Sequence, residues 1–238
     1  MDTIAVIDFE TTGISPEHGA RATEIAANLA GVRSRIEAAA RRAGRDPSSV
    51  TLLAVTKTKP LEDLLAAWEA GVRDFGENRV QEAEAKFPHL PSDAGRHLIG
   101  PIQSNKANKA ARLADVLHAV DSADLARRLA RAAANEGKRL AVYVEVNTGG
   151  EETKAGVTPE EVPALVAAVR ALPELDLRGL MSIPPPGDTR PHFVALRRLA
   201  ESLGLAELSM GMSDDLESAI EEGSTIVRVG TALFGSRS

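Results

Sequence analysis

Short apolar runs alternate with helical stretches along almost the whole chain. Each run is too short for a helix, and few polar residues interrupt it. Apolar strands that alternate with helices are typical of a parallel sheet covered by helices on its outer side. The eight predicted strands are Val50–Val55, Arg73–Gly76, His97–Gly100, Val116–Val120, Leu140–Val146, Leu175–Ile183, Glu207–Met210 and Ile226–Val229.

The stretches between these strands carry helical periodicity. A first helix, Ile25–Arg42, precedes the strands and repeats apolar residues at steps of four and three. Eight units of strand and helix indicate a closed barrel rather than an open sheet. We therefore predict an α/β fold, a single (β/α)₈ TIM barrel over residues 25–238 with an N-terminal helix. The other predicted helices are Leu61–Ala70, Arg79–Lys86, Ser104–Leu113, Ala123–Asn135, Pro159–Ala171, Pro191–Leu203 and Asp214–Glu222.

Composition excludes several classes of function. The net charge is −6 and aromatic residues make up 3% of the 238 residues, which argues against nucleic-acid binding. The chain has no cysteine, so disulfides and thiolate metal sites are excluded, and we expect no metal site. Nothing resembles a signal peptide or a membrane span. We expect a cytoplasmic protein that binds no membrane and, as a lone barrel, is a monomer.

Polar residues, Glu77 and Asn78 among them, follow the predicted strands, at the end of the barrel where active sites of this fold lie. Lys57 comes directly after the first strand, with the cationic Lys59 two residues further on. An amine in a partly desolvated position beside another cation becomes nucleophilic towards aldehydes. A lysine that points from a strand end into solvent is the alternative, and position alone does not separate the two.

The last two strands end in segments that suit an anion. Ser209–Asp215 closes the seventh strand with small and hydroxyl residues, and Arg228–Thr231 closes the eighth. Phosphate sites of TIM barrels commonly occupy these two loops, where backbone N–H groups and hydroxyls converge. The alternative is structural: Ser213 caps a helix and Gly230 serves only a turn. Together the two segments favour a phosphate site.

Five long motifs occur along the chain: Leu52–Pro60, Phe75–Glu82, Ile102–Lys106, Arg178–Met181 and Leu208–Gly235. In these motifs and in their order the sequence resembles the pyridoxal phosphate homeostasis protein family, from about Ile25 to Arg237. That likeness implies a barrel related to the amino-terminal domain of alanine racemase, which holds pyridoxal 5′-phosphate (PLP) as a cofactor.

The resemblance also implies a set of cofactor-binding residues. Lys57 would hold the PLP aldehyde as a Schiff base, and Arg228 would face the pyridine nitrogen. A guanidinium in that place donates a hydrogen bond and discourages ring protonation, which makes the ring a poorer electron sink. Pairing of Arg228 with a nearby carboxylate is the alternative. The remaining residues are Ser213, Gly230 and Thr231 at the phosphate, Asn78 and Met212 beside the cofactor, and Lys154 as a secondary attachment point.

Two functions fit these residues. The first is a carrier that holds and releases PLP, with PLP-dependent apoenzymes as recipients, and with no catalytic residue. The second is a PLP-dependent amino-acid racemase, which needs a second acid or base on the opposite face of the substrate. In racemases a tyrosine from an additional domain supplies that group. Here the chain ends at Ser238 and its one tyrosine, Tyr143, lies within the fifth strand. The sequence therefore favours the carrier.

Residues 1–24 do not fit the resemblance, and we interpret them as an appendage to the barrel. The segment Ile4–Gly13 resembles the first motif of DEDD 3′–5′ exonucleases, with Asp8 and Glu10 as the two carboxylates. Side chains two apart on a strand point the same way, as metal binding requires. The chain shows no second or third exonuclease motif, so exonuclease activity is a remote alternative.

Overall fold

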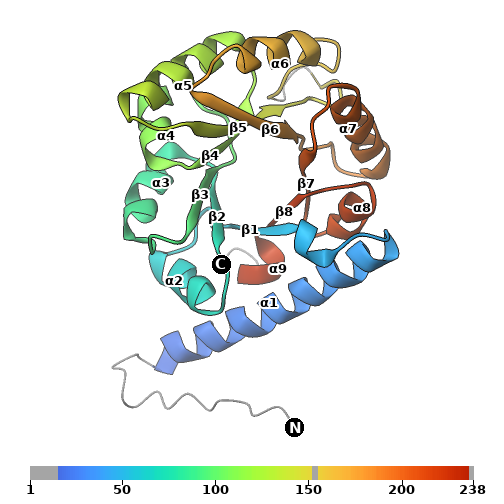
Figure 1. Cartoon of the computed structure of the whole chain (residues 1–238). Coiled ribbons are helices and arrows are strands. Elements are labelled where there is room, and N and C mark those ends of the chain that lie inside the picture. The colour runs from blue at the N-terminus through green and yellow to red at the C-terminus, as the bar shows by residue number, and fades with distance from the viewer. Residues whose placement is uncertain (1–15, 152–154, 236–238) are drawn as a thin grey trace.

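The eight predicted strands form one closed parallel barrel (Figure 1). The computed structural model describes residues 16–151 and 155–235. Strands adjacent in sequence are adjacent in the barrel, and β1 closes it by pairing with β8. The expected (β/α)₈ TIM barrel is confirmed. Its strands are β1 (Thr51–Val55), β2 (Asp74–Glu77), β3 (Gly95–Leu98), β4 (Val116–Val120), β5 (Leu140–Glu145), β6 (Leu175–Met181), β7 (Glu207–Met212) and β8 (Ile226–Val229).

Helices cover the outside of the barrel (Figure 1). Within the described residues, none is both long and apolar enough to cross a membrane. A last short helix, α9, follows β8 and was not predicted. The helices are α1 (Pro16–Arg42), α2 (Leu61–Glu69), α3 (Val80–Lys86), α4 (Ala107–Leu113), α5 (Ala123–Asn135), α6 (Val162–Arg170), α7 (Arg190–Ser202), α8 (Leu216–Glu221) and α9 (Thr231–Phe234).

The first helix is longer than the sequence pattern predicts. It begins at Pro16 instead of Ile25 and continues unbroken to Arg42. Proline is favoured in the first turn of a helix because its missing N–H has no helical partner there. The boundary expected after residue 24 therefore falls inside a continuous helix. The exonuclease-like segment, residues 4–13, lies outside the described residues.

Polar contacts, rather than an apolar stripe, hold the early part of α1. Arg21 donates hydrogen bonds to both carboxylate oxygens of Asp63 on α2, at 3.1 and 2.8 Å. It also donates to the carbonyl oxygen of Phe234 at 2.7 Å, where α9 ends. α1 packs beside α2, α8 and α9 along the outside of the barrel (Figure 1). A search for apolar periodicity cannot detect a segment held in this way.

Smaller differences from the predicted boundaries have a common cause. β3 runs over Gly95–Leu98 instead of His97–Gly100, because its ladder starts opposite Asp74, where β2 starts. β6 ends at Met181, two residues before the predicted end. The pairing of neighbouring strands sets these limits, whereas hydrophobicity alone marks only the buried part of each strand.

The core has two parts. The larger part lies between the strands and the surrounding helices. The smaller part fills the inside of the barrel, so the barrel is packed rather than hollow, as is usual for eight strands. Its buried members are Leu53, Val55, Ile99, Ala119, Tyr143, Met181 and Ile226.

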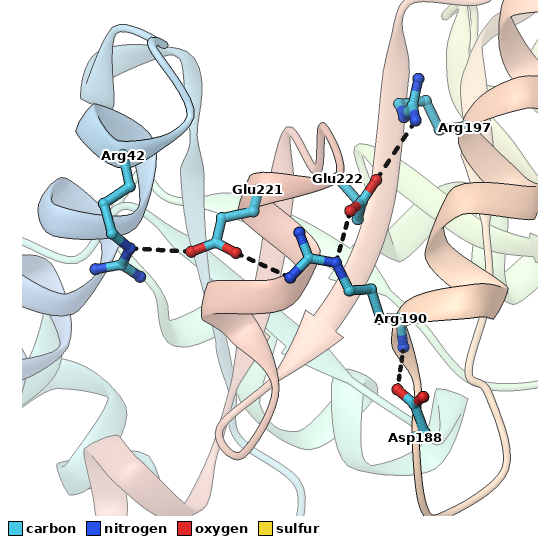
Figure 2. Close-up of polar contacts among 6 residues, drawn as sticks. All are labelled: Arg42, Asp188, Arg190, Arg197, Glu221 and Glu222. Atoms are coloured by element: carbon cyan, nitrogen blue, oxygen red, sulfur yellow. Dashed lines mark hydrogen bonds and ion pairs between the residues drawn. The ribbon is translucent and has the colours of Figure 1, made fainter.

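A series of ion pairs on the surface links α1, α7 and the end of α8 (Figure 2). Glu221 accepts from Arg42 at 3.0 Å and from Arg190 at 3.2 Å. Glu222 accepts from Arg190 at 2.8 Å and from Arg197 at 3.4 Å. We call these five residues the surface ion-pair chain. It joins helices that are far apart in sequence.

Candidate ligand site at the mouth of the barrel

The predicted site residues lie at the carboxyl ends of four adjacent strands. Lys57 and Asn78 follow β1 and β2, and Ser213 follows β7. Arg228 lies in β8, opposite Met212 of β7 and Leu53 of β1 in the ladders, and Gly230 and Thr231 follow it. Because β7, β8, β1 and β2 are consecutive around the barrel, these residues share one side of its mouth. Lys154 lies outside the described residues.

Lys57 lies in the turn that follows β1, two residues beyond Val55. Leu53 and Val55 belong to the core inside the barrel, so the end of β1 lies at that core. The side chain is exposed, as an amine that must meet a ligand requires. Lys59 contacts a different element, since its ammonium donates to the carbonyl oxygen of Phe234 at 3.2 Å.

The backbone before Lys57 is held by a buried polar group. The Lys86 ammonium donates to the carbonyl oxygen of Thr56 at 2.9 Å and to the carboxylate of Glu77 at 2.7 Å. The hydroxyl of Thr56 donates to the same carboxylate oxygen at 2.7 Å. Burial raises the pKa of Glu77, and the bonds from Lys86 and Thr56 oppose that rise. This arrangement fixes the end of β1.

Glu77 therefore faces away from the mouth, although it ends a strand. Gly76 lies against Leu53 and Ile99 of the inner core, so alternation turns Glu77 outward to Lys86. The sequence pattern counts Glu77 among the polar residues of the mouth, and the structure corrects that. Lys86 and its role were missed, because it lies on α3, away from any strand end.

The backbone after Lys57 is also fixed. Thr58 has a φ of 64°, the only non-glycine residue with positive φ among those described. Its N–H donates to the carboxylate of Glu82 at 2.9 Å. A left-handed conformation costs a β-branched residue free energy, so it persists where surrounding contacts enforce it. Lys57 is thus held on both sides by residues of β2 and α3.

Arg228 is buried inside the barrel, 3% exposed. Its Nη1 donates to the carbonyl oxygen and hydroxyl of Ser209 at 2.6 and 2.8 Å, and Nη2 donates to the carbonyl oxygen of Ser182 at 2.8 Å. Burial lowers the pKa of Arg228 to about 10, and the charges of Glu145 and Asp215 oppose that fall. Pairing with a carboxylate was the alternative interpretation, but these three hydrogen bonds all go to Ser209 and Ser182.

A buried carboxyl group lies near Arg228. Glu145 ends β5 on the same face as Tyr143, inside the barrel, and is 6% exposed. Its pKa is raised to about 7, mainly by burial and also by the charge of Asp121, while the charge of Arg228 opposes the rise. Its Oε2 has no hydrogen-bond partner among the described residues. In the sequence, Glu145 is a single acidic residue within an apolar run, and no motif marks it as part of a site.

The segments after β7 and β8 are joined to each other. The Ser213 hydroxyl accepts a hydrogen bond from the N–H of Ala232 at 3.2 Å, in the first turn of α9. The helix-cap alternative for Ser213 is not what the structure shows, because Asp215 occupies the N-cap position of α8. A Cβ at Gly230 would lie 3.4 Å from the carbonyl oxygen of Val55 on β1. Gly230 thus lets β8 end close to the strand that carries Lys57.

The turn after β2 is also closely packed. Asn78 is half-buried, and its Oδ1 is buried with no partner among the described residues. A Cβ at Gly100 would collide with the backbone of Asn78, so glycine is required after β3. Met212 is 40% exposed at the opposite side of the predicted set. Both residues lie where their strands end, Asn78 after β2 and Met212 at the last position of β7.

A groove lies at the other end of the barrel. It has a volume of about 650 Å³ and runs between α1 and the amino-terminal ends of β1 and β2. Arg33, Thr51 and Asp74 are among its lining residues. Because it is at the ends where the strands begin, it is distinct from the mouth that holds Lys57.

Comparisons with known proteins agree with this geometry. The family model described as alanine racemase, N-terminal domain, matches residues 27–238. The pyridoxal phosphate homeostasis protein of Pseudomonas aeruginosa is 50% identical over 222 residues, which cover 90% of this chain and 96% of that protein.

Two solved structures are similar over nearly their whole length. A protein of unknown function from Bifidobacterium adolescentis has a TM-score of 0.86 and 40% identity, covering 93% of this chain and 97% of its own. PipY of Synechococcus elongatus, solved with PLP bound, has a TM-score of 0.77 and 40% identity, covering 89% of this chain and 100% of its own. This chain therefore belongs to the alanine racemase N-terminal domain family and, within it, to the pyridoxal phosphate homeostasis proteins.

Proposed function

We propose that this protein binds PLP reversibly through Lys57 and acts as a carrier and buffer of the cofactor, without being an enzyme. The observation that carries the proposal is the position of Lys57. It is an exposed amine above the inner core, with the backbone held on both sides. The similarity to PipY with PLP bound supports it independently.

The residues of the mouth fit the three chemical parts of PLP. Lys57 offers an amine for the aldehyde. Arg228 has five N–H donors, and three are used by Ser209 and Ser182, so two can serve a ring nitrogen. Ser213, Gly230 and Thr231 offer two hydroxyls and backbone N–H groups for a phosphate. The residues of the mouth thus include a partner for the aldehyde, the ring nitrogen and the phosphate of PLP.

The work of each residue follows from its surroundings. Bound PLP would supply an aldehyde that reacts with a primary amine. Lys86 and Glu82 hold the chain around Lys57, so its amine meets the ligand from a fixed strand end. Arg228 donates and does not accept, so it disfavours a proton on a ring nitrogen that faces it. Asn78 and Met212 border the ligand on either side.

The structure favours a carrier over a racemase at one specific residue. Tyr143, the chain's one tyrosine, is 2% exposed inside the barrel, and its hydroxyl donates to Glu207 at the start of β7. Burial raises the pKa of Tyr143, followed by the hydrogen bond to Glu207. A buried, protonated phenol near the opposite end of the barrel is unsuited to act as a base at the mouth.

The location, oligomeric state and partners of the protein follow from the same role. We propose that it acts in the cytoplasm as a monomer and that PLP-dependent apoenzymes receive the cofactor from it, without nucleic acid or membrane as partner. The relatives named for PLP homeostasis support such a role. Light scattering should give the 25.1 kDa mass of one chain. Mixing loaded protein with a PLP-dependent apoenzyme should restore that enzyme's activity.

The test of PLP attachment is trapping with borohydride followed by peptide mapping. The protein incubated with PLP should gain a visible absorbance band, and reduction should fix one adduct on Lys57. Lys57→Ala should lose the band and the adduct, whereas Lys59→Ala, two residues away, should keep both. An adduct on Lys154 or Lys59 in place of Lys57 would contradict the proposal.

The racemase alternative has its own measurement. We expect turnover of alanine enantiomers by the loaded protein to equal that of Lys57→Ala. Turnover well above that variant would show catalysis and would contradict the assignment as a carrier.

A further inference from the structure

A continuous series of hydrogen bonds crosses the inside of the barrel. It runs from Asp74 to His97 at 3.0 Å, to His118 at 2.9 Å, to Ser209 at 2.9 Å, and to Arg228 at 2.8 Å. Each of the five residues comes from a different strand: β2, β3, β4, β7 and β8. We call them the buried hydrogen-bond chain. None of them except Arg228 has a part in the proposed binding of PLP.

With both rings neutral, the carboxylate end fixes the direction of these bonds, because Asp74 only accepts and the proton of His97 must therefore lie on Nε2. Arg228 only donates, so the Ser209 hydroxyl oxygen accepts and its O–H is free to donate to Nδ1 of His118. An Nδ1 that accepts requires His118 to carry its proton on Nε2, which then donates to Nδ1 of His97. The same argument places the proton of His97 on Nε2, where it donates to the Asp74 carboxylate. Each group is satisfied in this one arrangement.

The surroundings keep His118 in its neutral state. His118 is fully buried and stacks on Tyr143 with ring centroids 4.6 Å apart. Burial lowers the pKa of His118 well below its usual value, and the charges of His97 and Arg228 lower it further. His118 is therefore neutral at pH 7, with one N–H and one lone pair, which is what the chain requires.

The two ends of the chain lie at opposite ends of the barrel. Asp74 has a side chain 31% exposed and lines the groove beside α1. Arg228 lies below the mouth, where the charges of Glu145 and Asp215 act on it. The chain therefore connects a solvent-accessible carboxylate in the groove with the guanidinium at the ligand site.

We propose that Asp74, His97, His118 and Ser209 are positioning residues that set the orientation of Arg228 and keep it a donor towards the ligand. Ser209 holds Nη1 with two acceptors, so the guanidinium cannot rotate without breaking both bonds. His118 accepts from the Ser209 hydroxyl in this arrangement, which leaves the lone pairs of that oxygen to Arg228. The effect on PLP rests on the proposed function, whereas the orientation and tautomers belong to the protein alone.

The first test uses the full chain without PLP. Nitrogen-15 NMR of the histidine rings distinguishes the two neutral tautomers and the charged form, with assignment from single His→Gln variants. We expect His97 and His118 to carry the proton on Nε2 at pH 7. A proton on Nδ1 of either ring, or a charged His118 at that pH, would overturn the inference without bearing on PLP binding.

The second test breaks one link and restores it. Ser209→Ala removes the hydroxyl between Arg228 and His118, and Ser209→Thr keeps a hydroxyl on the same carbon. In the ligand-free protein we expect Ser209→Ala to speed exchange of the Arg228 Nη protons by about tenfold or more and to mix the His118 tautomers. Ser209→Thr should restore both properties. Unchanged exchange and tautomers in Ser209→Ala would overturn the inference.

The third measurement connects the chain with the ligand. Titration with PLP should give Ser209→Ala a weaker affinity and a shifted absorbance maximum, with both restored in Ser209→Thr. If the wild type fails to bind PLP, the proposed function fails while the two tests on ligand-free protein still decide the positioning role. If all three proteins bind PLP alike, with identical spectra, the positioning role towards the ligand is wrong.

Discussion

Two sets of five polar residues join distant parts of this molecule, and they differ in burial. The buried hydrogen-bond chain links five strands inside the barrel, and His118, Ser209 and Arg228 are no more than 3% exposed. The surface ion-pair chain links α1, α7 and the end of α8 (Figure 2), and its Arg42 and Arg190 side chains are 54% and 51% exposed. One set includes two histidines and a serine, whereas the other consists entirely of arginine and glutamate side chains.

The burial of a hydrogen bond or ion pair, rather than its formal charge, decides how much stability is lost when it is broken. A buried donor or acceptor that loses its partner keeps the full cost of its lost hydration. An exposed ion pair exchanges its partner for water and salt at little cost. We therefore expect the buried hydrogen-bond chain to control the stability of the fold and the orientation of Arg228. We expect the surface ion-pair chain to tolerate substitution.

The largest difference is expected between two arginines. Arg228→Met keeps an unbranched stem but removes three buried hydrogen bonds to Ser209 and Ser182. Ser209 keeps its bonds with the Ser182 N–H and with His118. Because a hydrogen bond to a charged group contributes about 1.5–3 kcal/mol, we expect the free energy of unfolding to fall by roughly 3–5 kcal/mol. Urea denaturation of ligand-free protein measures it.

The matched control is Arg197→Met in the surface ion-pair chain. The Arg197 side chain is 35% exposed and reaches Glu222 at 3.4 Å, so the expected loss is below about 1 kcal/mol. Equal losses in the two variants would remove the distinction between the chains.

An intermediate and pH-dependent effect is expected at Glu145. Burial raises its pKa from 4.5 to about 7, so the folded state favours the protonated carboxyl. The resulting stability is fully present below pH 4.5 and is lost as the pH rises through 7. A pKa difference of this size corresponds to on the order of 3 kcal/mol.

Glu145→Gln removes this titration. The free energy of unfolding of the variant, minus that of the wild type, should increase between pH 5 and pH 8, because only the wild type loses stability there. Taking the difference between the two proteins cancels groups that titrate in both, His118 among them. Chemical denaturation at four pH values measures it, and a difference that stays constant with pH would contradict the raised pKa.

The smallest effect is expected on the surface. Arg42→Gln breaks the ion pair with Glu221, and the free energy of unfolding should change by less than about 1 kcal/mol. In 1 M salt the difference from the wild type should disappear, because the Debye length falls to about 3 Å. The cost of Arg228→Met should be unchanged in the same salt. A salt-independent effect at Arg42 would show that packing of its stem, not its charge, matters.

The parts of the prediction that were accurate depended on local patterns. Eight apolar runs identified eight strands, because a strand buried on both faces must be apolar along its length. The position of Lys57 followed from the end of its run. The start of α1 was wrong by nine residues, because contacts such as Arg21 with Asp63, 42 residues apart, leave no periodic signal.

The sequence by itself determined the strand count, the barrel, and which strand ends carry Lys57 and Arg228. These depend on hydrophobic periodicity and on motifs within a few residues of each other. Only the tertiary structure decided that Glu77 turns away from the mouth, that Glu145 is buried near Arg228, and that two histidines connect Asp74 to Arg228. The physical reason is that burial and hydrogen-bond direction depend on neighbours from other strands, which barrel closure brings together.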